Sequence, residues 1–192
     1  GDNPTMTSQH SYCDFDSPHS AFWLFAYGSL MWEPNFPFTE QRRAILDGYH
    51  RALCVYSWVY RGTEETPGLV FGLEHGGQVE GIAFHIAAEH AEVVFAQVYD
   101  REMVTAVYKP VWTTCGLADG QSENVDALAF VAEHSNRQYA GERSQTETLD
   151  LVRQGHGKAG PCTEYVMNTV NHLRDLGIRD EGLEQVVAKL AD

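Results

Sequence analysis

The chain has 192 residues, 43% of them hydrophobic and 21% charged, and its formal charge is −14 at pH 7. This length and composition are typical of one soluble globular domain, which we place at residues 21–192, after a polar, disordered tail over residues 1–20. The negative charge argues against binding to nucleic acid or to anionic membrane surfaces. No stretch is long and apolar enough to cross a bilayer.

Cysteine and histidine spacing gives no sign of a metal site or of secretion. The cysteines form no Cys-x-x-Cys pair, and the nine histidines show no metal-ligand spacing. We therefore expect reduced thiols, no bound metal and a cytoplasmic location. The cysteines are Cys13, Cys54, Cys115 and Cys162.

The first predicted element lies in residues 22–32, which read FWLFAYGSLMW. The run up to Tyr27 is aromatic, aliphatic or small, which favours a strand buried on both faces. It breaks at Gly28 and Ser29, where glycine lets the chain turn and exposes backbone N–H groups. Such a turn can bind an anion or a developing oxyanion. Taken alone, these residues favour the simpler interpretation, a first strand followed by an ordinary turn.

Further strands are expected along the first two thirds of the chain. Residues 42–60 are rich in β-branched and aromatic side chains, and Gly48 indicates a bulge within one long strand. Residues 69–74 and 79–86 flank His-Gly-Gly-Gln, a pattern that predicts a β-hairpin with its turn at residues 75–78. Two more strands are expected, at residues 106–115 and 124–132, joined by a turn at residues 118–120.

Helical patterns occur once between the strands and then to the end of the chain. Residues 87–103 have the spacing of one amphipathic helix. Ser144 and Glu147 form a capping box, Pro161 begins a helix that ends at Gly177, and a last helix spans residues 181–190. This order predicts an α+β fold whose sheet is mainly antiparallel and barrel-like.

The segment Gly-His-Gly-Lys-Ala-Gly at residues 155–160 spells the dinucleotide-binding pattern GxGxxG. It lacks the required context, because the preceding segment is helical and no strand follows to complete a βαβ unit. We interpret it as a connection between two helices.

Charged residues gather at the end of the helix predicted for residues 87–103. Asp100, Arg101 and Glu102 run directly into an aromatic and aliphatic strand. For Asp100 and Arg101, a solvated helix end is a sufficient explanation. Glu102 is the better candidate for function, since burial disfavours a charged carboxylate and makes it a stronger base.

Several short motifs, spread from about residue 22 to residue 178, resemble the γ-glutamylcyclotransferases of the ChaC type. The YGSL motif is shared with wider relatives, including γ-glutamylamine cyclotransferases, and the later motifs are those that point to ChaC. Ala26 departs from the pattern, because many members have glycine there. The matching residues are Phe25, Tyr27-Gly28-Ser29-Leu30-Met31-Trp32, Gly48-Tyr49-His50-Arg51, Tyr56-Ser57, Arg61-Gly62-Thr63, Pro67-Gly68, Arg101-Glu102-Met103, Tyr139-Ala140-Gly141, Gly160-Pro161, Glu164-Tyr165 and Asn168-Thr169.

The resemblance implies that glutathione is converted to 5-oxoproline and cysteinylglycine without a cofactor. By analogy with the family's glutamate, Glu102 is the general base that deprotonates the substrate amine. The turn formed by Tyr27, Gly28, Ser29 and Leu30 is expected to bind the substrate carboxylate or the oxyanion. Arg61 is a candidate partner of a substrate carboxylate, and Tyr139 a candidate hydrogen-bond donor.

Other readings stay open at this point. The chain could be a cyclotransferase for other γ-glutamyl amines or peptides, or a hydrolase or acyltransferase with Ser29 as nucleophile and a histidine brought close by folding. It could also be a non-catalytic module that binds a γ-glutamyl-like ligand. Such a module would not need a base at Glu102. The oligomeric state is not predicted.

Overall fold

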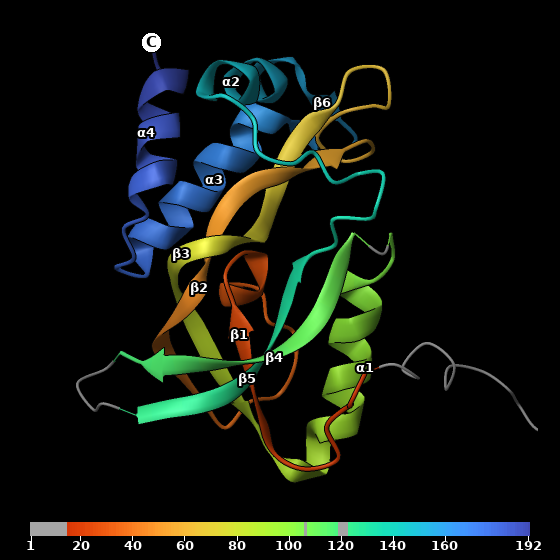
Figure 1. Ribbon diagram of the computed structural model, residues 1–192, viewed down its shortest axis with the longest axis vertical. Coiled ribbons are helices and arrows are strands. Elements are labelled where there is room, and N and C mark those ends of the chain that lie inside the picture. The colour runs from red at the N-terminus through yellow and green to blue at the C-terminus, as the bar shows by residue number, and fades with distance from the viewer. Residues whose placement is uncertain (1–14, 106, 119–122) are drawn as a thin grey trace, which may run out of the picture.

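The computed structural model describes residues 15–105, 107–118 and 123–192 (Figure 1). Most of the expected turn at residues 118–120 lies outside these ranges, as do Cys13 and most of the expected tail. Phe15 stacks against Phe95 and Trp112, with ring centroids 5.8 and 6.0 Å apart. The end of the expected tail therefore packs against the fold.

Five strands close into a barrel in the order β1-β3-β2-β4-β5. Neighbouring strands are antiparallel except β1 and β5, which run parallel and pair Trp23 with Ala127. The expected α+β fold with a mainly antiparallel, barrel-like sheet is thus confirmed. The strands are β1 (Phe22–Ala26), β2 (Glu40–Ser57), β3 (Gly68–Ile86), β4 (Tyr108–Leu117) and β5 (Glu123–Ala132).

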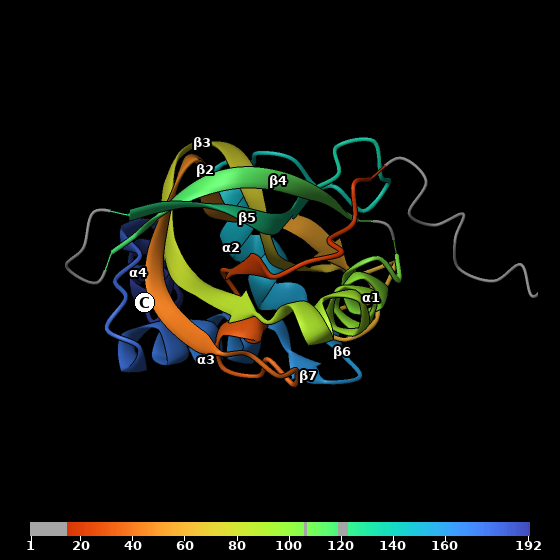
Figure 2. The same cartoon turned by 90° about the horizontal axis from the view of Figure 1, so that it is seen from below.

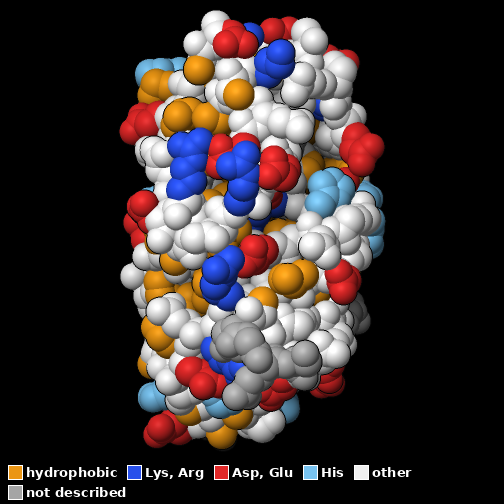
Figure 3. All heavy atoms as spheres, turned by 90° about the vertical axis from the view of Figure 1, so that its left-hand side faces the viewer, with side chains coloured by type: hydrophobic (Ala, Val, Ile, Leu, Met, Phe, Trp, Pro, Cys, Tyr) orange, Lys and Arg blue, Asp and Glu red, His pale blue; other side chains and the backbone are white. Residues whose placement is uncertain are grey.

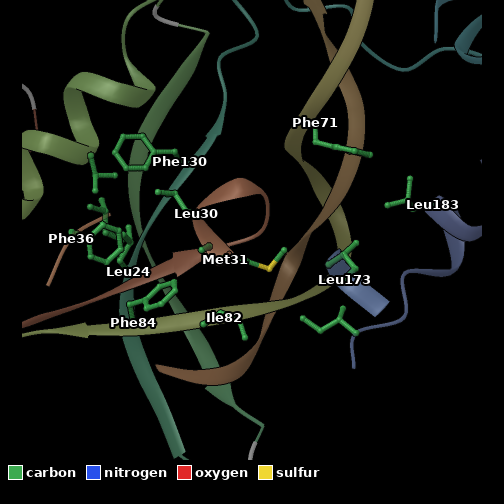
Figure 4. Packing of buried hydrophobic residues seen from close by; sticks show 14 of the residues in the cluster. Leu24, Leu30, Met31, Phe36, Phe71, Ile82, Phe84, Phe130, Leu173 and Leu183 are labelled. Carbon is green, nitrogen blue, oxygen red and sulfur yellow. The ribbon is translucent and has the colours of Figure 1, made fainter. Parts of the chain in front are cut away.

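Strand β1 is buried on both faces, as its sequence predicts. Phe25 packs inside the barrel in a cluster that draws residues from all five strands, among them Leu46 and Leu73. Leu24 points the other way, into a larger cluster that includes Phe84 and residues of the helices (Figure 4). Because successive side chains of a strand alternate between its faces, β1 links the two clusters.

The prediction of a β-hairpin with its turn at residues 75–78 is wrong. Strand β3 passes through this segment without reversing and stays paired with β2 on both sides of it. Gly76 and Gly77 have φ values of 105° and 71°, and Gly48 on β2 has a φ of 90°. The pairing register shifts at this point, so the glycines form an irregularity that bends the two-stranded ribbon. The chain turns instead at residues 58–67, between β2 and β3.

The helices lie in two places relative to the barrel (Figures 1 and 2). Helix α1 (Ala91–Glu102), preceded by the short turn η3 (Ala88–His90), runs along one side and connects β3 to β4. The other three helices gather around the far end of the β2–β3 ribbon (Figure 1). They are α2 (Gln145–Gln154), α3 (Cys162–Asp175) and α4 (Glu181–Leu190).

The predicted helix signals are present in the structure. Ser144 caps α2 by accepting a 3.2 Å hydrogen bond from the backbone N–H of Glu147. Gly177, with a φ of 75°, follows the end of α3. The GxGxxG segment contains β6 (His156–Gly157) and the first residue of β7 (Gly160–Pro161), and these strands form a small hairpin that connects α2 to α3. This segment is the helix connection that its context indicated.

None of the helices in the described part of the chain is long and apolar enough to span a membrane. On the face shown in Figure 3, Lys and Arg side chains lie close to Asp and Glu side chains.

Gly81 on β3 offers a test of how tightly β1 is packed. A methyl group at this position would collide with the backbone oxygen of Ala26 and lie 2.9 Å from the ring of Phe25. Overpacking of this kind costs about 1–3 kcal/mol, and in a protein of this size each kcal/mol lowers the melting temperature by about 2–4 °C. We expect Gly81→Ala to melt several degrees below the wild type.

Gly116→Ala on β4 is the matched control. Its methyl group would lie 3.3 Å from the side-chain oxygen of Asn124, a side chain that can move, and at an ordinary contact distance of 3.9 Å from the backbone oxygen of Ile45. Calorimetry should therefore rank Gly81→Ala well below Gly116→Ala. Equal melting temperatures would contradict the tight approach of β1 to β3.

Candidate active site

The turn after β1 forms the floor of the candidate site. It contains the short helix η2 (Ser29–Met31), in which the N–H of Met31 donates to the carbonyl of Gly28 at 2.9 Å. The first N–H groups of a helix have no acceptor within that helix. Here these groups belong to Ser29 and Leu30. No atom lies within 4 Å of the position that a Cβ on Gly28 would take, so open space adjoins the turn.

A small cavity of about 90 Å³ opens beside this turn. Its walls come from the end of β1, from η2, from β3, β4 and β5, and from α1 and α3, so no single segment builds it. The lining residues are mostly apolar or aromatic. They are Phe25, Ala26, Tyr27, Gly28, Ser29, Leu30, Phe71, Glu102, Tyr108, Phe130 and Tyr165.

Glu102 supplies the carboxylate in this cavity. It is the last residue of α1, and it lines the same cavity as the turn after β1. Burial raises the pKa of Glu102, because the ionised carboxylate loses hydration, and the neighbouring Arg101 guanidinium partly opposes that rise. The site therefore contains a carboxylate whose surroundings favour proton uptake.

Three tyrosines surround the carboxylate. Burial is the largest cause that raises the pKa values of Tyr27, Tyr108 and Tyr165, and the charge of Glu102 raises each of them further. These hydroxyls stay protonated at neutral pH and can donate hydrogen bonds. The Tyr108 hydroxyl donates to the carbonyl of Phe71 at 2.7 Å, and the Tyr165 hydroxyl accepts from the N–H of Phe71 at 3.1 Å.

Sequence reasoning missed Tyr108 and Tyr165 as site residues. Tyr165 belongs to one of the motifs that carry the family resemblance, and this was the available signal for it. Tyr108 is the first residue of β4, where a tyrosine is an ordinary strand residue. Only folding brings the two side chains to the wall opposite the turn.

Arg101 connects the turn to the helix that carries Glu102. Its guanidinium donates to the hydroxyl of Ser29 at 2.8 Å and to the carbonyl of Glu33 at 3.1 Å. Among the described residues that line the cavity there is no histidine to act as a base for Ser29. The Ser29 hydroxyl is thus held by a cation rather than activated by an imidazole.

Arg61 lies behind the cavity wall and not on it. Its guanidinium donates to the carbonyl of Pro161 at 3.0 Å, lies 3.6 Å from the carboxylate of Glu164, and sits 5.8 Å from the ring centroid of Tyr165. Because Tyr165 lines the cavity, Arg61 is connected to the site indirectly, by its contact with the ring of Tyr165.

Tyr139 is also outside the set of residues that line the cavity. Its hydroxyl donates to the buried carboxylate of Glu74 at 2.5 Å, and its ring stacks on His134 with centroids 4.2 Å apart. The structure therefore brings Glu102 into one cavity with the four predicted residues of the turn, Tyr27, Gly28, Ser29 and Leu30. It does not bring Arg61 or Tyr139 onto the wall of that cavity.

Comparison with known proteins gives a consistent set of matches. The family model for ChaC-like protein matches residues 22–192. A glutathione-specific γ-glutamylcyclotransferase of Escherichia coli is 32% identical over 168 residues, which cover 88% of this chain and 72% of that protein. Glutathione-specific γ-glutamylcyclotransferase 1 of the rat is 29% identical over 189 residues, which cover 96% of this chain and 84% of the relative.

The fold also matches a solved structure. A crystal structure of a yeast γ-glutamyl cyclotransferase specific to glutathione superposes with a TM-score of 0.79. The match covers 90% of this chain and 96% of the yeast chain at 19% sequence identity, so it shows a shared fold.

The raised pKa of Glu102 predicts a pH-dependent effect on stability. Because the pKa is higher in the folded state, the contribution of this carboxyl is fully present below its unfolded pKa and is lost as the pH rises through the folded value. Because a Gln side chain does not ionise, the Glu102→Gln variant does not lose this contribution to stability as the pH rises. The melting temperature of Glu102→Gln, relative to wild type, should therefore rise between about pH 4 and about pH 8.

Glu65→Gln, which makes the same substitution at an exposed position, is measured beside it as the control. A Glu102→Gln difference that is flat with pH would show that Glu102 is not desolvated in the folded protein.

Proposed function

The chain belongs to the ChaC-like family, and from that premise we propose that it is a γ-glutamylcyclotransferase that converts glutathione to 5-oxoproline and cysteinylglycine. The observation that carries the proposal is the pairing of one half-buried carboxylate, Glu102, with the turn after β1 in a single small cavity.

The reaction requires a base. The α-amine of the γ-glutamyl group is largely protonated at neutral pH, and it must lose a proton before it attacks its own side-chain amide carbon. Glu102 takes that proton, and the amine then closes the five-membered ring by forming the new C–N bond. As the tetrahedral intermediate collapses and the amide C–N bond breaks, the second proton of the attacking nitrogen passes to the departing nitrogen. Glu102 returns the first proton to it, so that cysteinylglycine leaves with a protonated amine.

Hydrogen-bond donors around the cavity suit the charge that develops. The carbonyl oxygen of the scissile amide becomes an oxyanion during ring closure, and the N–H groups of Ser29 and Leu30, which have no acceptor within η2, are its proposed donors. The Tyr165 hydroxyl on the opposite wall accepts from the N–H of Phe71 and keeps its own proton, so it adds a neutral donor. Donors fixed in a poorly hydrated site stabilise such charge more strongly than water does.

The size of the cavity favours cyclisation. At about 90 Å³ it is smaller than the roughly 300 Å³ or more typical of pockets for drug-sized ligands. It therefore suits the γ-glutamyl end, with the dipeptide outside. Holding that end folded back places amine and carbonyl together, and well-oriented intramolecular reactions reach effective molarities of about 10⁵ M or more.

The charge of the protein sets a second requirement. A chain with a formal charge of −14 repels a substrate that carries two carboxylates, so local cations and donors must outweigh that field. Arg101 lies beside the turn and is exposed. Arg61 as a carboxylate partner and Tyr139 as a donor stay proposals that need movement of side chains now engaged elsewhere.

The alternatives differ in the support they receive. A cyclotransferase for other γ-glutamyl amines or peptides would use the same carboxylate and turn. A non-catalytic binding module has no need of a desolvated carboxylate there. For acyl-enzyme chemistry at Ser29, the hydroxyl would need a base in place of the Arg101 guanidinium.

We also propose that the enzyme acts in the cytoplasm. Three of its cysteines, Cys54, Cys115 and Cys162, are buried free thiols, which suits a reducing compartment.

Replacing the base tests the mechanism directly. Glu102→Gln keeps size and hydrogen-bonding capacity but cannot accept the proton, so release of 5-oxoproline from glutathione should fall by about 10²–10⁴-fold. The control is Glu92→Gln, which changes an exposed glutamate on the same helix and should retain activity. Near-normal activity of Glu102→Gln would rule out Glu102 as the base.

The substrate proposal is tested with a series of γ-glutamyl compounds. We expect kcat/KM to be highest for glutathione, clearly lower for γ-glutamylcysteine, which lacks the distal glycine carboxylate, and lowest for γ-glutamyl-lysine. Should the γ-glutamyl amine be the best substrate, the chain would act on amines and the glutathione proposal would be wrong.

A further inference from the structure

A buried arginine lies directly behind the candidate site. Arg51 is on β2, and its side chain is 1% exposed. Each of its three nitrogens has a different partner: Nε donates to the carbonyl of Tyr27 at 2.8 Å, Nη1 to the carboxylate of Asp180 at 2.6 Å, and Nη2 to the carbonyl of Glu80 at 2.9 Å. A planar guanidinium with all three nitrogens bound has one orientation only.

The bond to Tyr27 fixes a peptide plane of the active-site turn. In a trans peptide, the carbonyl of one residue and the N–H of the next point in opposite directions. Because Arg51 holds the Tyr27 carbonyl on its own side, the N–H of Gly28 is turned to the other side. Gly28 lines the active-site cavity there, and open space adjoins its Cα.

We infer that Arg51 is a positioning residue. It holds the Tyr27–Gly28 peptide so that the Gly28 N–H points into the cavity and can donate a hydrogen bond to an anionic group of the ligand. The inference rests on the proposed function, in which that cavity binds a γ-glutamyl group. A glycine is not held by side-chain packing, so without this bond the peptide plane could turn and present the carbonyl, an acceptor, to an anionic ligand.

Asp180 connects Arg51 to the C-terminal helix α4. One of its carboxylate oxygens pairs with Arg51, and the other accepts a 3.0 Å hydrogen bond from the N–H of Leu183, which caps α4. The same carboxylate thus anchors the helix and balances the buried charge that orients the turn. Sequence distance hides this link, because Tyr27, Arg51 and Asp180 come from widely separated parts of the chain.

Arg51→Lys is the sharpest variant. Lysine keeps the positive charge next to Asp180 but has no donor at the position of Nε, so the bond to the Tyr27 carbonyl should be lost. Asp180→Asn is the second variant. Asparagine is also a good helix cap, so α4 should stay capped while the ion pair is removed. Glu184→Gln, which weakens the 2.6 Å ion pair between α4 and Arg174 of α3, is the control.

Two measurements are made well below each melting temperature. The first is kcat/KM for glutathione as a function of pH. Losing an oxyanion donor outright costs about 10²–10³-fold in kcat, so a misplaced one should cost Arg51→Lys about tenfold or more in kcat/KM. The acid limb of the profile should not move, because Glu102 is untouched. Asp180→Asn should show a smaller loss, and Glu184→Gln should match the wild type.

The second measurement is independent of turnover. NMR of protein labelled with ¹³C and ¹⁵N should show changed shifts for the Tyr27 carbonyl and the Gly28 amide in Arg51→Lys, and a weaker response of the Gly28 amide to added 5-oxoproline. A merely structural role would leave both signals of the folded molecules unchanged. If they equal those of the wild type, the inference is overturned.

The two proposals fail separately. A wild-type protein that does not convert glutathione would overturn the proposed function, while the shifts of Tyr27 and Gly28 in the variant without ligand would still report on the orientation of the peptide. Normal turnover by wild type together with unchanged kcat/KM in Arg51→Lys would overturn the role of Arg51 alone.

Discussion

The desolvation of one carboxylate is the constraint on which the rest of the site depends. The pKa of Glu102 is raised because its carboxylate loses hydration at a wall where β1, β3, β4, β5, α1 and α3 meet. Closure of the barrel brings these elements together, since β1 is fixed between β3 and β5. Any change that lets water reach the cavity would make Glu102 a weaker base.

The parts of the structure that depend on local patterns could be predicted from the sequence. The apolar run before Gly28 specified a strand buried on both faces, and Ser144 with Glu147 specified a helix start, because each signal acts within a few residues. The hairpin turn predicted at residues 75–78 was wrong because it rested on two consecutive glycines, which favour a turn. They also permit a bend in a continuous ribbon, and pairing with β2 decided between the two.

The candidate site was predictable only in part, for the same reason. Glu102 and the turn after β1 carry their own signals, an ionisable residue before an apolar strand and a glycine after one. Tyr108 and the partners of Arg51 owe their place to register and barrel closure, which no local pattern encodes. Arg61 was predicted to bind a substrate carboxylate because it is positively charged. In the fold, its guanidinium contacts the carbonyl of Pro161 and the carboxylate of Glu164 instead.

The central claim is that burial makes Glu102 the base, and a direct titration tests it. With ¹³C-labelled glutamate, NMR can follow the Glu102 carboxyl across the pH range while kcat/KM for glutathione is measured under the same conditions. The account predicts a midpoint above the ordinary pKa of glutamate that coincides with the acid limb of kcat/KM, which reports the free enzyme. A midpoint at or below the ordinary value, or one unrelated to that limb, would contradict it.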